Sequence, residues 1–107
     1  MIRYYVVLHR REGISREAFL HAWTVEHAAL ARALPGVLAV ATHPSLEGAD
    51  FDGIGVLDFA DEPSLAACLA SPQGQAVRAH TATFADPDRA QRFIVHVGQS
   101  LSGSYDG

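Results

Sequence analysis

One stretch of the sequence places two ionisable side chains beside an apolar surface. If residues 16–34 form a helix, with about 100° between successive residues, one narrow face carries the large apolar side chains of Phe19, Trp23, Leu30 and Leu34. Glu26 and His27 lie at the two margins of that face. A histidine there is partly desolvated, so its pKa moves readily around neutrality and it can exchange a proton with a bound ligand. The spacing allows proton-transfer chemistry at His27, but a hydrogen bond within the fold, with Glu26 solvated, explains the same pattern.

Other side chains can complete a pocket around His27. Trp23 and Phe19 on the helix and Leu57 on a later strand can exclude water from it. The first strand carries two successive tyrosines, which must point to opposite faces of a sheet, and we assign Tyr5 to the pocket. The candidate site therefore has one titratable centre surrounded by aromatic and aliphatic side chains.

The composition excludes several classes of chemistry. The eight basic residues are all arginines, and without lysine no Schiff base or phosphate-loop lysine is possible. With Cys68 alone, the chain can form neither an intrachain disulfide nor a cysteine-rich metal site. Cys68 is predicted to be a buried neutral thiol, or a thiolate if it meets His27 across the pocket. The formal charge of −4 disfavours nucleic acid as a partner.

The predicted elements alternate between strands and helices. Ser15 is a typical N-cap for the first helix, Pro35-Gly36 ends it, and Ser71-Pro72 marks a new helix start. The expected strands are residues 2–9, 37–43, 53–60 and 92–97, and the expected helices are residues 16–34, 62–69 and 72–84. They form one domain over residues 1–99, followed by a flexible tail at 100–107. The short apolar run at the N-terminus is neither a signal sequence nor a membrane span, so we expect a cytoplasmic protein without a membrane partner.

The order βαββαβ predicts an α+β domain of the ferredoxin-like type. Such a domain has a four-stranded antiparallel sheet with its helices on one face. The predicted strands carry large apolar residues on both faces, whereas a sheet with one wet face alternates cleanly between polar and apolar. A second copy of the chain is the simplest cover for the other face, which predicts a homodimer. At this length one chain is expected to form a core but not a large internal pocket as well.

Several segments resemble the EthD family, over nearly the whole chain. The most specific is the pattern Trp-x-x-x-His-x-x-Leu, which begins at Trp23. The matching segments are residues 13–19, 23–31, 34–37, 51–54 with Phe59, and 71–76. The resemblance implies a dimeric α/β barrel, and it implies that His27 is the family's recurrent histidine of the first helix, at a pocket between helices and sheet.

The resemblance also implies polar partners that this chain lacks. Many relatives carry a glutamate where this chain has Val56, an aromatic residue where it has Asp58, and an acid where it has His80. Asp58, on the same strand face as Val56, is our candidate for a displaced carboxylate. We expect Asp58 or Glu26 to orient His27 as a general acid or base.

These features predict a small cofactor-independent enzyme that acts on a hydrophobic cyclic, lactone or polyketide-like metabolite. The reaction class is isomerisation, cyclisation or dehydration by proton transfer at His27, as the family resemblance implies. A non-catalytic binding or accessory protein for an apolar metabolite is the alternative, followed by a haem-binding or cofactor-free monooxygenase barrel. The sequence has no glycine-rich phosphate cradle and no metal-ligand cluster, so we expect no flavin, nicotinamide or metal.

Overall fold

The computed structural model describes residues 1–98 and has the element order predicted from the sequence. The elements are β1 (Ile2–Leu8), α1 (Arg16–His21), η1 (Ala22–His27), α2 (Ala28–Arg32), β2 (Ala39–Pro44), β3 (Gly53–Phe59), α3 (Glu62–Ala70), α4 (Pro72–Phe84) and β4 (Gln91–His96). The flexible tail expected at 100–107 and the domain end expected at residue 99 lie outside the described residues. Within residues 1–98, the helices are all too short or too polar to cross a bilayer.

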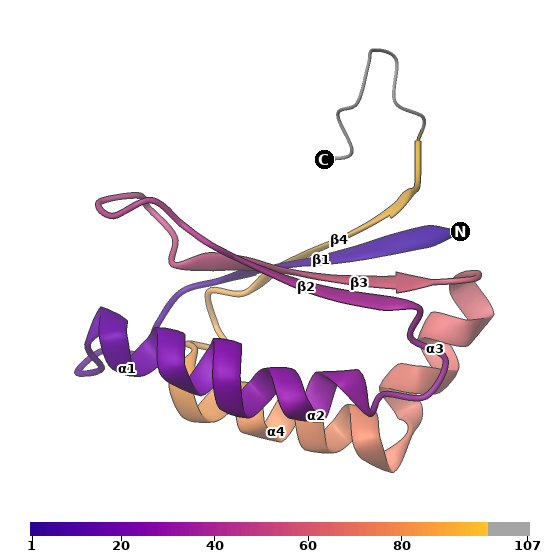
Figure 1. Cartoon of the computed structure of the whole chain (residues 1–107), viewed down its shortest axis with the longest axis horizontal. Helices are drawn as coiled ribbons and strands as arrows, with labels where there is room; N and C mark the ends of the chain where they lie inside the picture. The colour runs from indigo at the N-terminus through magenta and orange to yellow at the C-terminus, as the bar shows by residue number, and fades with distance from the viewer. Residues whose placement is uncertain (99–107) are drawn as a thin grey trace.

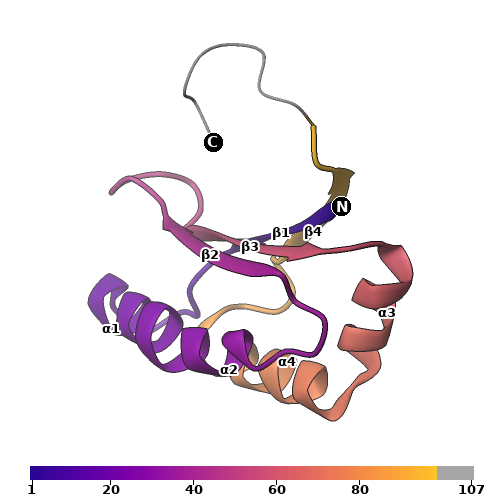
Figure 2. The ribbon, with the colours of Figure 1, turned by 45° about the vertical axis from the view of Figure 1, so that its right-hand side comes forward.

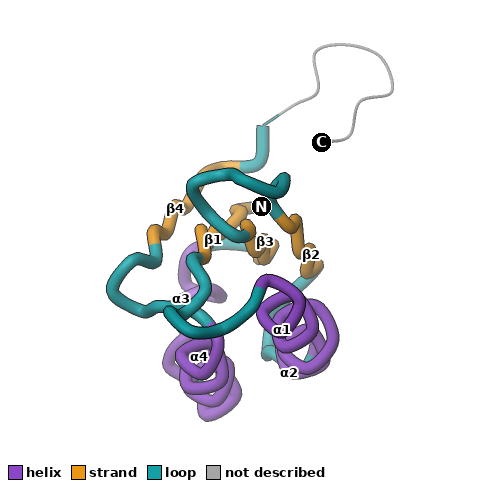
Figure 3. The backbone as a smooth tube through the Cα atoms, turned by 90° about the vertical axis from the view of Figure 1, so that its left-hand side faces the viewer, coloured by secondary structure: helices purple, strands orange, loops and turns teal. Residues whose placement is uncertain are grey.

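The strands form one antiparallel sheet in the order β2-β3-β1-β4. Within residues 1–98, the helices all lie on the same side of this sheet, and its other side carries no helix (Figures 1 and 2). Seen end-on, α1 and α2 lie below the β2 side of the sheet, and α4 lies below the β4 side (Figure 3). The ferredoxin-like α+β fold expected from the sequence is confirmed.

The helices begin where the sequence predicts caps. The Ser15 hydroxyl accepts a hydrogen bond from the Ala18 amide at 3.1 Å at the start of α1. Ser71 ends α3 and also caps α4, because its hydroxyl accepts from the Gly74 amide at 3.0 Å. A Cβ on Gly74 would collide with the Cys68 carbonyl group, so only glycine allows this close turn between the two helices.

The first helix is continuous from residue 16 to 32 but changes its winding in the middle. Residues Ala22–His27 form a π-helical segment, η1. A π-turn spans one more residue than an α-turn, so it shifts the residues that follow by one position around the helix. Leu30, predicted to face the sheet, is 40% exposed, and Ala31 is buried in its place. The predicted stripe is wrong at this one position, because it assumed constant α-helical winding.

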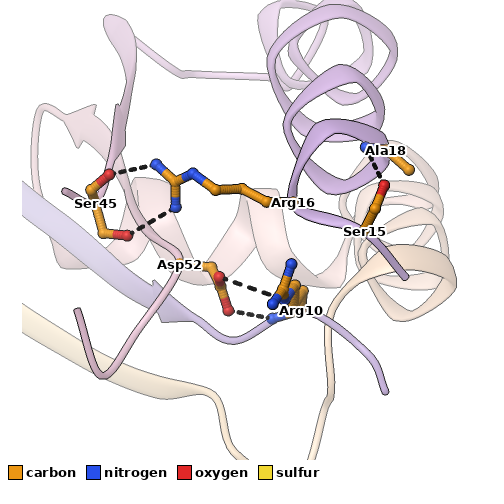
Figure 4. Close-up of polar contacts among 6 residues, drawn as sticks. All are labelled: Arg10, Ser15, Arg16, Ala18, Ser45 and Asp52. Atoms are coloured by element: carbon orange, nitrogen blue, oxygen red, sulfur yellow. Dashed lines mark hydrogen bonds and ion pairs between the residues drawn. The ribbon is translucent and has the colours of Figure 1, made fainter. Parts of the chain in front are cut away.

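The connection between β2 and β3 is tied to the start of α1 (Figure 4). Arg16 donates hydrogen bonds to the hydroxyl and the carbonyl oxygen of Ser45. The Asp52 carboxylate accepts from the Arg10 amide at 2.8 Å and also pairs with the Arg10 guanidinium. These contacts fix the N-terminal end of the first helix relative to the sheet, and so help position the side chains further along it.

The apolar core between helices and sheet has two parts. One cluster contains Ile2, Tyr4, Ala31, Leu34, Phe59, Leu65 and Cys68. The other contains Leu8, Phe19, Trp23, Phe84 and Ala85. Val6, half-buried at the middle of β1, packs against both clusters. The helices thus pack against the sheet through two separate clusters of buried side chains.

The face of the sheet away from the helices is also largely apolar. Tyr4 packs in the core, so its strand neighbour Tyr5 faces away from the helices. The strand register places Val56 and Phe93 opposite Tyr5, and of these two residues Phe93 is exposed and Val56 is buried. Phe93 and Val95 of the edge strand β4 are exposed. The expectation that both faces carry apolar residues is therefore confirmed.

Gly53 of β3 gives the first prediction. A Cβ at this position would collide with the Trp23 indole, whereas a Cβ on Gly55, two residues along the same strand, meets nothing within 4 Å. Overpacking a core costs about 1–3 kcal/mol. We expect Gly53→Ala to lower the free energy of unfolding by that amount and Gly55→Ala to change it by less than about 0.5 kcal/mol. Chemical denaturation followed by tryptophan fluorescence measures both, and equal effects of the two substitutions would contradict the packing described here.

Candidate active site

A cavity of about 340 Å³ lies between the sheet and the helices. Its walls are mostly apolar, and they come from both core clusters and from the middle of the sheet. The sheet contributes Tyr4, Val6, Gly55 and Leu57 to these walls, and the helices contribute Trp23, His27, Ala31 and Thr81. The volume is at the lower end of the range for small-molecule sites, about 300–1,000 Å³. The two core clusters leave a space between them for a small ligand, and the large internal pocket that we did not expect from one chain is not what this cavity provides.

His27, the last residue of η1, is a buried imidazole in the wall of this cavity. It is 9% exposed, and its Nδ1 lies 3.0 Å from Nδ1 of His80 on α4. The two ring planes are only 10° apart while the ring centres are 5.2 Å apart. Because the nitrogens are much closer than the centres, the rings meet edge to edge, as a hydrogen bond requires. The Phe84 ring packs against both imidazoles in edge-to-face geometry, with ring centres 5.3 and 5.4 Å apart, and holds the pair in place.

The neighbouring Thr81 assigns the proton positions on His27. The Thr81 hydroxyl donates to the Val77 carbonyl oxygen at 2.8 Å, so toward Nε2 of His27, 3.3 Å away, it can only accept. His27 therefore carries its proton on Nε2, and its Nδ1 accepts a hydrogen bond from the Nδ1–H of His80. His27 and Thr81 both line the cavity. The Nε2–H edge is thus the one nearest to a ligand, and the contact of 3.3 Å is long enough for a ligand atom to compete for it.

Burial determines the charge of His27. Desolvation, followed by repulsion from His80, lowers its pKa from 6.5 to about 4. His27 is therefore neutral at pH 7, when it can donate through Nε2 and accept through Nδ1. A neutral imidazole with both nitrogens engaged is compatible with an apolar wall, since no buried polar atom is left without a partner.

The sequence matches the model of the EthD domain over residues 11–88. The match covers well over half of the chain. The chain belongs to the EthD family. No match is found among curated proteins.

Solved structures share the fold at low sequence identity. An EthD family protein from Bacillus halodurans has 19% identity and a TM-score of 0.77, with 92% of this chain and 100% of that chain covered. A dimeric ferredoxin-like protein of unknown function from Thermobifida fusca has 18% identity and a TM-score of 0.71, with 90% of each chain covered. SnoaB, a cofactor-independent oxygenase from Streptomyces nogalater, has 12% identity and a TM-score of 0.71, with 95% of this chain and 97% of that chain covered. The TM-scores show a shared fold, and at identities this low the similarity shows the fold alone.

Some of the predicted site residues of this EthD domain lie together and some do not. Trp23 and Leu57 line the cavity beside His27, as expected for a hydrophobic wall. Phe19 is fully buried behind Trp23, with ring centres 5.6 Å apart, and does not line the cavity. Its contribution is to hold the indole in place.

Asp58 does not lie near His27. It follows Leu57, which faces the helices, so its side chain is on the open face of the sheet. There it pairs with Arg3, whose Nε and Nη2 donate to the two carboxylate oxygens at 2.7 and 3.1 Å. The expectation that Asp58 replaces the EthD carboxylate beside His27 is corrected, because adjacent residues of a strand point to opposite faces.

Two other residues that we predicted for the site, Glu26 and Tyr5, lie outside the cavity. Glu26 is exposed on η1, where the π-winding turns His27 toward the cavity and leaves Glu26 in solvent. Tyr5 faces the open side of the sheet, and Tyr4 lines the cavity instead. Neither Glu26 nor Tyr5 is among the residues in contact with the cavity.

Cys68 lies inside a core cluster and not in the cavity wall. It is 1% exposed, and burial raises the pKa of its thiol. Of the two readings left open by the sequence, the structure therefore shows the buried neutral thiol. A meeting with His27 across the pocket does not occur.

Sequence reasoning missed His80 and Thr81 as partners of His27. They lie 53 and 54 residues further along the chain, so no local spacing connects them to it. The one available signal is the difference from EthD relatives, many of which have an acid where this chain has His80. His80 now occupies the place in which we expected a carboxylate to orient His27.

The site does not fit haem or a metal cluster. Haem ligation needs an imidazole nitrogen with a free lone pair directed at the iron, whereas Nε2 of His27 carries its proton and Nδ1 accepts a hydrogen bond from His80. Within residues 1–98, no three His, Cys, Asp or Glu side chains gather as a metal site.

The lowered pKa of His27 predicts a pH-dependent stability. Because the pKa is about 4 in the folded chain and 6.5 as the ordinary value, the unfolded chain binds the proton more readily between these values. The His27 contribution is therefore complete above pH 6.5 and is lost as the pH falls toward 4, with a slope of at most about 1.4 kcal/mol per pH unit. Unfolding free energies of wild type and His27→Asn should converge over this window, whereas exposed His21→Asn should run parallel to wild type. Parallel curves for His27→Asn would contradict the buried neutral state.

Proposed function

We propose that this protein is a cofactor-independent enzyme that transfers a proton to or from a small hydrophobic metabolite of the cyclic, lactone or polyketide type. The observation that carries the proposal is a neutral, buried imidazole in the wall of an apolar cavity, hydrogen-bonded to a second imidazole. His27 is the acid and base that meets the ligand. His80 is its proton-exchanging partner, held outside the cavity wall.

The hydrogen-bond directions define the proposed steps. His27 donates its Nε2–H to a carbonyl or hydroxyl oxygen of the ligand, in place of the Thr81 hydroxyl. When that proton is transferred, the Nδ1 of His27 takes a proton from the Nδ1 of His80. The ligand gains one proton, and His27 stays neutral with its proton now on Nδ1. Half-buried His80 also stays neutral, because its Nε2 takes up a proton from water as its Nδ1 gives one up. The reverse sequence passes a proton from the ligand through His27 and His80 to water, and isomerisation, cyclisation and dehydration each combine such steps. Acid–base catalysis of this kind contributes typically about 10²- to 10⁴-fold in rate.

The surroundings support the proposal. Trp23, Leu57 and Ala31 give the cavity an apolar wall, and a hydrogen bond from His27 to a developing charge is stronger in apolar surroundings than in water. SnoaB, which shares the fold, is described as a cofactor-independent oxygenase. That description supports chemistry without a bound cofactor on this scaffold, and it keeps a cofactor-free oxygenase as a reaction class for the activity screen.

A screen of lactones and polyketide-type compounds for turnover tests the function. For any compound that reacts, we expect His27→Gln to lower kcat by about 10²-fold or more while Kd changes by less than about threefold. His80→Asn should lower kcat and change its pH profile, and exposed His21→Asn should leave kcat unchanged. If His27→Gln abolishes binding, or changes only stability, the non-catalytic binding protein replaces the enzyme.

We further propose that a second copy of the chain covers the open face of the sheet. Half-buried Tyr5 and exposed Phe93 and Val95 make this face apolar, and large exposed apolar patches mark interaction sites. The Thermobifida fusca protein with this fold is described as dimeric. In such a homodimer the Arg3–Asp58 pair would be buried at the interface.

Sedimentation tests the homodimer. Wild type should sediment at micromolar concentration with twice the 11.5 kDa of one chain. Val95→Arg, on the open face, should dissociate the dimer or lower its stability, because a charge without a partner is costly to bury. Leu46→Arg in the exposed β2–β3 connection is the matched control and should remain dimeric. A folded wild-type monomer at this concentration would contradict the proposed homodimer.

A further inference from the structure

The exposed residues in the lining of the cavity all lie on one side of the described structure. Almost all of its lining residues are buried or half-buried, and the exceptions are Arg78, Pro87 and Arg92. Arg78 lies on α4, Pro87 on the α4–β4 connection and Arg92 on β4. These elements lie on the same side of the molecule (Figure 3). The mouth of the cavity is therefore between α4 and β4, and two of its three exposed residues are arginines.

The two mouth arginines differ from others in the chain. Arg3, Arg11 and Arg16 donate side-chain hydrogen bonds to groups of the protein. Among the hydrogen bonds and ion pairs of residues 1–98, the side chains of Arg78 and Arg92 have no partner. Their guanidinium groups are therefore available to a ligand.

One acidic residue also lines the mouth, and it leaves a positive balance. Asp86 is half-buried, and its Oδ1 accepts a hydrogen bond from the Asp88 amide at 3.0 Å. Two guanidinium groups and one carboxylate give the lining a formal charge of +1 with His27 neutral, in a chain whose formal charge is −4. The formal charge of the mouth is thus positive, whereas that of the protein as a whole is negative.

We infer that the ligand of this cavity is a small apolar carboxylic acid, with its hydrocarbon part in the cavity and its carboxylate at Arg78 and Arg92. The guanidinium group matches a carboxylate because its parallel N–H groups can donate to both oxygens. A volume of about 340 Å³ suits a one- or two-ring molecule. The inference names the substrate class of the same site, and in that respect it rests on the proposed function.

Helix α4 sets the distance between the proposed carboxylate site at Arg78 and the reacting group, His27. Arg78 and Thr81 are three residues apart on α4, so they lie on the same face, with their Cβ atoms about 5–6 Å apart. Thr81 in turn contacts Nε2 of His27. A carboxylate at Arg78 therefore places the ligand atoms a few bonds away from it beside the proton of His27. The arginines act as positioning residues for the proton transfer.

Binding of matched acids and amides tests this inference directly. The probes are cinnamate and 1-naphthoate, each compared with its primary amide, which has the same shape but no charge. Isothermal titration at low salt measures Kd. We expect wild type to bind each acid at least tenfold more tightly than its amide. Arg78→Gln and Arg92→Gln should each reduce this preference, and the double variant should abolish it while amide binding stays unchanged.

Arg89→Gln is the matched control. Arg89 is exposed on the same connection and does not line the cavity, so its loss removes a charge nearby without changing the mouth. It should keep the acid preference. Equal binding of acids and amides by wild type, an unchanged preference in the double variant, or no binding of either series at millimolar concentration overturns the inference.

The outcomes also separate this inference from the proposed function. His27→Gln should keep the preference for acids, because the carboxylate is held at the mouth and not by His27. If acids bind selectively but none is turned over, the site is a carboxylate-binding site and the catalytic proposal fails alone. If neutral compounds are turned over and acids are not preferred, the catalytic proposal stands and the carboxylate inference fails.

Discussion

The π-helical turn of the first helix is the constraint on which the site depends. With one extra residue in that turn, Trp23, His27 and Ala31 all point between helix and sheet, while Glu26 and Leu30 remain exposed. Only then does the imidazole reach across to α4 and meet His80. Such turns interrupt regular hydrogen bonding and are frequent at functional sites. Here the irregular winding turns an amphipathic helix into one wall of a cavity.

The apolar core is divided into two clusters, and this division leaves room for the cavity. The aromatic cluster around Phe19 and Phe84 and the aliphatic cluster around Leu34 and Phe59 each hold helices to the sheet. Because both ends of the sheet are secured, the middle can stay open without loss of the fold. A protein of this size therefore holds a ligand-sized space and still buries its large side chains. The imidazole pair lies at the border between tight packing and that space.

The sequence predicted the order of elements, their caps and the apolar character of both sheet faces, because these depend on local periodicity. It did not predict which residues share a face at the site. Leu57 and Asp58 were both assigned to the pocket, although neighbours on a strand point in opposite directions. Tyr5 was assigned to it where Tyr4 is the residue inside. The His27–His80 contact joins segments 53 residues apart, and such contacts follow from tertiary packing alone.

Gly55 has a consequence for how members of such a fold can diverge. It lies at the middle of β3, opposite Val6, and the space above it is empty. A methyl group introduced there points into the cavity and meets no neighbour within 4 Å. Replacing Gly55 by alanine, valine or leucine would reduce the cavity volume in steps. A single position therefore sets the size of the ligand that fits. Substrate range can therefore change during evolution with little effect on the foldability of the chain.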